Sequence, residues 1–570
     1  MPTRQPLAAP TPPAPVDQAD VIACLAAPGA YGAGSGPVER IDTHTSVVFL
    51  VDDRAFKLKR AVQFDYLDYS TPEQRRRCCL EEVRLNRRTA PQLYRRVRAV
   101  RQAPTGLLAL DGWGHAVDYV VEMKRFHADA QLDRLAERGG LDEALMPRLA
   151  DAVADLHEVA EASFDQGGRR GMAAVLRGVR DGMRAHGREV LEHAAAEPLW
   201  AACLRALVLR GSLLDARRAA GFVRRGHGDL HLRNICLLGG QPVLFDCIEF
   251  NQAIACVDVM YDLAFLLMDL LHRNLPGHAN AVLNGYLERT GDVGGLALLP
   301  LFLAVRAAIR AMTQATAAPL HRGAAEAAAL RGDARRYLTL AQELVTPAAP
   351  RLVAVGGPSG SGKTTLARRL AASVGPAPGA LVVRSDVERK RLLGAPVDER
   401  LGPGGYTESV TRDVYRILAE RADAVLRSGH GVVVDAVFGD HAARTALREV
   451  ARANRVQFSG LWLDASLDVL RARIEARVGD ASDATAEVAA RQIEELHAPV
   501  SWTPLDANAE AAAVWQAARR ALAGAPASPA RAPRAKPRRG TKRADAPAAT
   551  EPVGAVLDRG HGQAHHEPDP

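Results

Sequence analysis

The chain has 570 residues, of which 48% are hydrophobic and 24% are charged. Its length is too great for one ordinary core and favours two to four domains, and its composition fits a soluble globular enzyme. A membrane span is not expected, because the most apolar stretch, residues 296–312, is too short and is interrupted by Arg306 and Arg310. We expect this stretch to form a buried helix.

The net charge of +7 does not indicate a nucleic-acid-binding protein. Seven basic residues and no acidic residue lie in 531–543, and outside this stretch basic and acidic residues are equal in number. A flexible, solvated run is the favoured interpretation, since no aromatic residues are interleaved with these charges. We therefore expect neither nucleic acid nor a membrane as a partner, and the sequence leaves the oligomeric state open.

The two ends of the chain differ in composition from the rest. Residues 1–19 and 524–570 are rich in Pro and Ala and are predicted to be disordered. The N-terminal stretch has no apolar segment like that of a signal peptide. The seven cysteines form no CxxC pair and no metal-binding pattern, which favours reduced thiols and a cytoplasmic location.

The first half of the chain begins with strands and continues with helices. Residues 45–51 and 54–60 are predicted strands joined by a tight turn, residues 74–90 a helix, and residues 116–126 a further strand. From 141 to 220 and from 255 to 345 the pattern is mostly helical. A small β-rich lobe followed by a large helical lobe is the α+β bilobal arrangement of protein kinases, which we assign to residues 20–345. Residues 346–350 are the predicted linker to a second domain.

The stretch "RRGHGDLHLRN", residues 224–234, has the spacing of a kinase catalytic loop. Phosphoryl transfer needs a carboxylate for the acceptor hydroxyl, ligands for Mg²⁺ and a Lys on the phosphates of ATP. Asp229 occupies the position of the catalytic carboxylate, and Asn234 can return to a metal ion. Asp246 ends a predicted strand where a kinase places its second metal ligand, although the tripeptide is Asp-Cys-Ile instead of Asp-Phe-Gly.

Two lysines in "AFKLK", Lys57 and Lys59, are candidates for the phosphates. A strand alternates its faces, and the small Ala55, two residues before Lys57, leaves room over the adenine, so Lys57 is the better candidate. Glu82, on the following helix, is its predicted partner. His227 is more suited to bracing the loop than to catalysis.

The segment "HGDLHLRN" resembles the aminoglycoside phosphotransferase and choline kinase group at every fixed position of its His-Gly-Asp-x-His-x-x-Asn pattern. Protein kinases have Arg where this chain has Gly228, and that Arg docks a phosphorylated activation loop. No Ala-Pro-Glu follows Asp246. The resemblance implies an acceptor that is a small hydroxylated molecule and not a protein.

The second phosphate motif is "RLVAVGGPSGSGKTTLARRL", a predicted strand, glycine loop and helix. It satisfies the Walker A pattern of an α/β P-loop NTPase fold with a parallel sheet, here residues 351–523. Lys363 is expected to reach the outer phosphates and Thr364 to bind Mg²⁺, and Asp435 at the end of "GVVVD" is a weak Walker B candidate for the metal. The candidate nucleotide-binding residues are Gly357, Gly360, Gly362, Lys363, Thr364 and Thr365.

This second domain resembles the gluconate kinase, chloramphenicol phosphotransferase and zeta-toxin group of P-loop kinases. The resemblance implies that Asp386, in "LVVRSDVERKR", meets the acceptor hydroxyl as a catalytic residue. It also implies a lid whose arginines, Arg473 and Arg477, contact the nucleotide. A solvated helix face explains these two arginines equally well, and both interpretations stay open.

The order of the motifs from 35 to 520 resembles a bacterial family described as bifunctional aminoglycoside phosphotransferase-like and ATP-binding proteins, often labelled AAA family ATPases. This family resemblance does not supply the substrate. Our first hypothesis is an ATP-dependent kinase with ATP and Mg²⁺ as cofactors and two ATP sites, each transferring the γ-phosphoryl group to a small-molecule hydroxyl. Two alternatives remain: one domain is catalytic and the other a regulatory ATP-binding module, or the chain is a toxin-like kinase that acts on a macromolecule.

Overall fold

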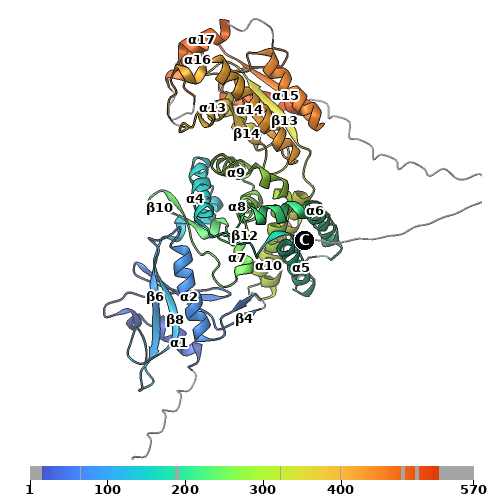
Figure 1. Cartoon of the computed structure of the whole chain (residues 1–570). Helices are drawn as coiled ribbons and strands as arrows, with labels where there is room; N and C mark the ends of the chain where they lie inside the picture. Colours follow the sequence, from blue (N-terminus) through green and yellow to red (C-terminus); the bar gives the residue numbers. More distant parts are fainter. Residues whose placement is uncertain are drawn as a thin grey trace, which may run out of the picture. The chain divides into compact units, whose positions relative to one another are not determined.

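A computed structural model describes residues 16–524, except 65, 187–189, 192, 321–322, 398, 477–481 and 495–499 (Figure 1). The predicted disorder of residues 1–15 and 525–570 lies outside the described residues. Helix α1 begins at Gln18, within the stretch that composition assigned to the terminus, because Asp17 caps it by accepting a hydrogen bond from the N–H of Ala19.

The first sheet is antiparallel and has six strands in the order β1-β2-β3-β8-β6-β7. Strands β2 and β3 match the two predicted strands, and Asp52 in their turn has the positive φ of 52° that a tight hairpin requires. The strands are β1 (Glu39–Asp42), β2 (Ser46–Val51), β3 (Arg54–Lys59), β6 (Tyr94–Gln102), β7 (Leu108–Leu110) and β8 (His115–Lys124).

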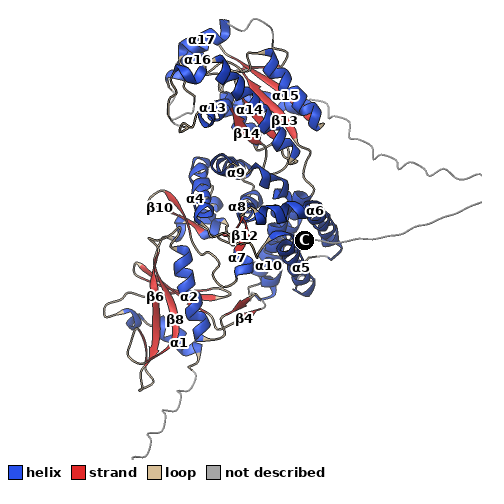
Figure 2. Cartoon of the chain, in the orientation of Figure 1, coloured by secondary structure: helices blue, strands red, loops and turns tan. Residues whose placement is uncertain are grey.

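Helix α2 (Pro72–Asn86) packs against β6 and β8 and carries Glu82 toward the sheet (Figure 2). It begins where the sequence supplies a capping box, since Thr71 accepts from the N–H of Gln74 and the Gln74 side chain accepts from the N–H of Thr71. A short hairpin, β4 (Gln63–Phe64) and β5 (Leu67–Asp68), precedes it.

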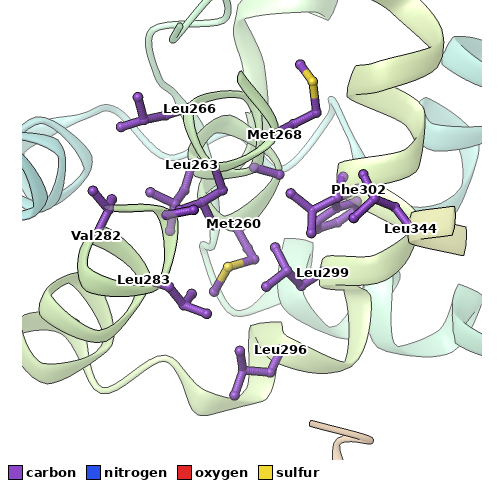
Figure 3. Packing of buried hydrophobic residues seen from close by; sticks show 14 of the residues in the cluster. Met260, Leu263, Leu266, Met268, Val282, Leu283, Leu296, Leu299, Phe302 and Leu344 are labelled. Carbon is purple, nitrogen blue, oxygen red and sulfur yellow. The ribbon is translucent and has the colours of Figure 1, made fainter. Parts of the chain in front are cut away.

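The following lobe is mostly helical and is built around helix α8 (Val259–His272), which is buried from Val259 to Leu270. Helices α9 and α10 pack against it, and Figure 3 shows the side chains that meet there: Met260, Leu263, Val282, Leu283, Leu299 and Phe302. The other helices of the lobe surround this core. The helices are α3 (Leu132–Glu137), α4 (Met146–Val159), α5 (Gly168–His186), α6 (His193–Ala219), α7 (Gln252–Ala255), α9 (Pro276–Thr290), α10 (Leu299–Ala317) and α11 (Ala324–Val345).

Two small antiparallel sheets position the catalytic loop in this lobe. Strand β9 (Val223–Arg225) pairs with β12 (Cys256–Asp258) just before the loop, and β10 (Ile235–Leu238) pairs with β11 (Gln241–Leu244) just after it. The loop from 226 to 234 is therefore held at both ends by backbone hydrogen bonds.

The second region is a parallel five-stranded sheet in the order β14-β15-β13-β16-β17, with helices connecting the strands. Its central strands are continuous apolar runs, as expected for strands covered on both faces. The strands are β13 (Arg351–Gly356), β14 (Leu381–Arg384), β15 (Val432–Asp435), β16 (Gln457–Asp464) and β17 (Thr503–Asp506). The helices are α12 (Lys363–Ala371), α13 (Ser385–Leu392), α14 (Glu408–Arg427), α15 (His441–Asn454), α16 (Leu467–Glu475), α17 (Ala486–Glu494) and α18 (Ala511–Gly524).

The predicted fold class is confirmed in both regions: a bilobal kinase-like α+β fold, then a P-loop α/β fold with a parallel sheet. Residues 346–350, the predicted linker, form neither helix nor strand. Among the described residues one helix, Val293–Ala317, is long and apolar enough to cross a membrane. However, 67% of its apolar 18-residue segment is buried inside the protein. This is the stretch predicted as a buried helix, and Phe302 and Arg306 within it are buried.

Two candidate phosphate-transfer sites

Asp229 lies at the centre of the first site, between two side chains of its own loop. The Asn234 amide donates to Asp229 Oδ2 over 3.0 Å, and His231 Nε2 lies 3.3 Å from the same oxygen. The Asp229 side chain keeps 39% of its surface exposed, so a ligand can reach it. Burial alone would raise the pKa of Asp229, but the charges of His231, Arg310 and His227 outweigh it and hold the pKa well below its usual range. Asp229 is therefore ionised at neutral pH.

Gly228 shows why this loop has no arginine before its aspartate. Its φ of +83° lies in the left-handed region, which side-chain-bearing residues rarely adopt. A Cβ atom there would also approach the Ile248 side chain to 3.1 Å. Backbone geometry and packing together exclude an arginine at this position.

Buried groups of the helical lobe brace the loop from behind. The Asp262 carboxylate accepts from the backbone N–H groups of His227 and Gly228 over 2.6 and 2.9 Å. Arg306 donates to the Gly228 carbonyl over 3.2 Å. The fully buried His227 donates from Nε2 to the Phe245 carbonyl, which ties the loop to the segment that carries Asp246.

The hairpin β10–β11 brings Asn234 and Asp246 to one end. Ile235 pairs with Leu244, and the Phe245 N–H donates to the Asn234 carbonyl over 3.0 Å. Asp246 has an unusual φ of +66° for a residue with a side chain, a feature that concentrates at functional sites. Since the Asn234 amide nitrogen is used by Asp229, its oxygen and the Asp246 carboxylate remain to bind a cation, and oxygen ligands of this kind fit Mg²⁺.

Lys57 joins the sheet to this site. Its Nζ lies 2.9 Å from Glu82 Oε1, as the sequence predicted, and 2.5 Å from Asp246 Oδ1. Burial would lower the pKa of Lys57, but Asp246 and Glu82 outweigh it and raise the pKa above its usual value. Burial would raise the pKa of Glu82, and the two lysines lower it to about 2 instead. Both groups are charged, so Lys57 presents a positive charge where phosphates are expected.

Lys59, the less favoured of the two candidate lysines, takes part in the same cluster through contacts that the sequence did not predict. Its Nζ is buried, lies 2.6 Å from Glu82 Oε2, contacts Glu249, and lies 3.3 Å from the Tyr69 hydroxyl. Glu82 thus binds one lysine with each oxygen. Glu249 lies three residues after Asp246, the candidate metal ligand. Through Glu82 and Glu249, Lys59 therefore connects helix α2 to the segment that carries Asp246.

We expect Lys59→Met to lower the free energy of unfolding by about 3–5 kcal/mol, because it leaves Glu82 and Glu249 buried without their shared cation. Urea unfolding measures this loss. The double variant Lys59→Met/Glu249→Gln removes one of the stranded charges, so it should be less destabilised than the sum of the two single variants. Strict additivity of the three measurements would show that the two residues are not coupled.

The second site lies at the carboxyl edge of the parallel sheet, where ligands of α/β folds bind. The glycine loop follows β13 and leads into α12, whose first residue is Lys363. Gly357, with a φ of +140°, packs so closely that a Cβ atom would lie 2.6 Å from the Leu463 carbonyl oxygen. A side chain at position 357 would therefore disturb the packing of the glycine loop against β16, and the helix that follows the loop offers its N-terminus to a phosphate group.

One cavity of about 350 Å³ gathers most of the predicted residues of this site. Asp435, at the end of β15, accepts a hydrogen bond from the Thr364 hydroxyl over 2.6 Å, and this pair of oxygen groups fits Mg²⁺. Burial, and next the charge of Asp435, raise the pKa of Asp386. The predicted residues that line the cavity are Gly360, Gly362, Lys363, Thr364, Thr365, Asp386, Asp435 and Arg473.

Of the two arginines that the resemblance assigns to a lid, Arg473 lines the cavity and donates to the Ala507 carbonyl over 2.9 Å. Arg477 lies outside the described residues. Gln492 on α17 is a site residue that the sequence analysis missed, and its side chain accepts from the N–H of Ser359 in the glycine loop over 2.8 Å. No spacing rule points to it, because 133 residues separate the two partners.

Comparisons with known proteins match these two regions separately. Residues 79–299 match the model of the phosphotransferase enzyme family, and residues 352–499 match that of an AAA domain. Uncharacterized proteins of Mycobacterium tuberculosis and Mycobacterium bovis are each 34% identical to this chain over 458 residues, which is 79% of this chain and 88% of theirs. The chain belongs to their family.

This chain joins a phosphotransferase domain to a P-loop domain, as the sequence predicted, and it is an ATP-dependent phosphotransferase. Solved structures similar to parts of it include a choline kinase from Cryptosporidium parvum Iowa II, with 10% identity and a TM-score of 0.36, covering 58% of this chain and 97% of that chain. A sugar kinase from Janibacter sp. HTCC2649 has 24% identity and a TM-score of 0.24, covering 30% of this chain and 95% of that chain.

Proposed function

We propose that the chain is a bifunctional kinase with two ATP sites, each transferring the γ-phosphoryl group of ATP to a hydroxyl group of a small molecule. The observation that carries this proposal is that each region keeps a full set of phosphotransfer groups. Each has a lysine for the phosphates, oxygen ligands for a cation, and a separate carboxylate for the acceptor. A domain that only senses ATP has no need of that carboxylate.

In the first site, Asp229 orients the acceptor hydroxyl and receives its proton as the new oxygen–phosphorus bond forms. The bond between the γ-phosphorus and the bridging oxygen breaks, and ADP leaves. Lys57, held by Glu82, binds the phosphates, and Asn234 with Asp246 holds the metal ion. Mg²⁺, when bound, neutralises charge on the phosphates.

In the second site, Asp386 has the role of Asp229. Lys363 and the N–H groups of the glycine loop bind the phosphates, Thr364 and Asp435 hold the metal ion, and Arg473 approaches from the lid. We expect a small hydroxylated acceptor in both sites, because Gly228 leaves no arginine to dock a phosphorylated activation loop and the second domain resembles the gluconate kinase and chloramphenicol phosphotransferase group.

The test is a mass-spectrometric survey of a bacterial metabolite extract incubated with ATP and the full chain. Lys363→Ala leaves only the first site active, and Asp229→Asn leaves only the second. We expect each variant to lose a different set of phosphorylated small molecules and the double variant to lose all of them. If every product depended on the same one of these two residues, the other domain would be regulatory. Phosphate transferred only to protein or nucleic acid would contradict the proposal of small-molecule acceptors.

A further inference from the structure

Helix α10 places two arginines one turn apart beside the catalytic loop. Arg306 is buried, binds the Gly228 carbonyl and lies 3.8 Å from Asp262, so its charge is used inside the protein. Arg310 follows at the i+4 position, on the same face of the helix. Arg306 contacts Gly228, and the charge of Arg310 lowers the pKa of Asp229, the next residue of the loop.

The surroundings of Arg310 differ from those of Arg306. Its guanidinium carbon lies 5.6 Å from the centre of the Tyr337 ring, which in turn stacks on His272 at 3.6 Å. Arg310 is only half-buried. Within the part of the chain that the structure describes, no carboxylate lies within 4.0 Å of its guanidinium, whereas nearby Arg273 has Asp269 at 3.3 Å. A half-buried arginine on a fixed aromatic platform with no carboxylate in contact suits the binding of an external anion.

The charge of Arg310 also acts on the reacting group. Burial would lower the pKa of Arg310, but Tyr337, Asp269 and Asp229 outweigh it and keep the guanidinium charged. A cation in this position repels a positively charged acceptor and attracts a negatively charged one. The sign of the acceptor's charge matters because aminoglycosides and choline, for which similar kinases are named, are cations.

We propose that Arg310 is a specificity-determining residue of the first site, which binds an acidic group, a carboxylate or a phosphate, on the molecule whose hydroxyl Asp229 orients. The inference rests on the proposed kinase function of that site. The acceptor is then a small hydroxy acid or a phosphorylated alcohol. Transfer itself is unchanged: the hydroxyl oxygen bonds to the γ-phosphorus, its proton goes to Asp229, and ADP leaves.

The experiment uses the full chain with Lys363→Ala, so that only the first site acts. A bacterial metabolite extract is separated by ion exchange into anionic, neutral and cationic fractions, and the anionic fraction is divided into carboxylates and phosphate esters. Each fraction is incubated with ATP, and only products that disappear in Asp229→Asn are counted. We expect such products from the anionic fraction, and the carboxylate and phosphate arms identify which acid Arg310 binds.

Arg310→Gln should then raise the acceptor concentration needed for half-maximal rate by about 10- to 100-fold, as expected for a lost hydrogen bond to a charged group. The half-saturating ATP concentration should stay the same. Arg310→Lys keeps the charge and should recover part of the loss, and Arg210→Gln, an exposed arginine on α6, is the matched control. Unchanged urea unfolding and ATP binding in Arg310→Gln establish that the fold is intact.

Asp229-dependent products from only the neutral or cationic fraction would overturn the inference and leave the kinase function standing. The inference would also be overturned if Arg310→Gln raised the half-saturating concentration of ATP and left that of the acceptor unchanged. Arg310 would then act on the nucleotide. If no fraction yields an Asp229-dependent product, the proposed function of the first site is wrong, and the inference falls with it.

Discussion

Replacing Asp229 with Asn is expected to lower phosphotransfer at the first site by roughly 10²- to 10⁴-fold, the range for a positioned acid–base group. Asn keeps the shape of the side chain but has no charge, so it can neither accept the hydroxyl proton nor orient the hydroxyl as strongly. The Asn234 amide and His231, which contact Asp229 in the loop, retain an oxygen to bind. The loop should therefore fold, and ATP affinity should change little. The measurement is made on the full chain with Lys363→Ala, so that the second site cannot mask the loss.

Asp246→Asn is the matched comparison, because it makes the same chemical change 17 positions along the chain. Asp246 is proposed as a metal ligand and also contacts Lys57 at 2.5 Å. Its loss should weaken Mg²⁺-dependent nucleotide binding, which calorimetry with an ATP analogue at several Mg²⁺ concentrations measures. If Asp229→Asn retained full phosphotransfer, the assignment of Asp229 as the catalytic carboxylate would be wrong.

The Lys363→Ala chain is expected to bind one nucleotide per chain under conditions in which the wild-type chain binds two. Lys363 begins helix α12 and lines the cavity together with the glycine loop. A hydrogen bond to a charged group contributes about 1.5–3 kcal/mol, so its removal lowers affinity about 10- to 150-fold. The measurement is equilibrium binding of a non-hydrolysable ATP analogue. Its concentration is just high enough to fill both wild-type sites, so that the weakened site of Lys363→Ala stays largely empty.

Arg416→Ala is the control for this measurement. Arg416 lies on helix α14 with its side chain 56% exposed and paired with Asp413 and Glu420, a surface arrangement that contributes little to stability. Its removal should leave two nucleotides bound. A wild-type stoichiometry of one would contradict the proposal that both regions bind ATP.

The sequence alone determined the two folds, and it nominated Asp229, Asn234, Asp246, Lys363 and Thr364 as the centres of the two sites. It could do so because each phosphate motif is a short contiguous segment whose glycines and spacing set the local backbone. The Walker A loop needs only the strand before it and the helix after it. The catalytic loop likewise is one short segment, and two small strand pairs hold its ends. Lys57 and Glu82 were paired from strand alternation and from the position of the next helix.

Only the tertiary structure decided which distant side chains complete these sites. Lys59 meets Glu249 across 190 positions, Gln492 reaches the glycine loop across 133, and the charge of Arg310, on a mostly apolar helix, acts on Asp229. Ion pairs and hydrogen bonds of this kind depend on how whole elements pack, and no local spacing encodes them. The sequence offered Lys57 and Lys59 as alternatives. Glu82 binds both lysines, one with each carboxylate oxygen, and this arrangement forms only because helix α2 packs on the sheet.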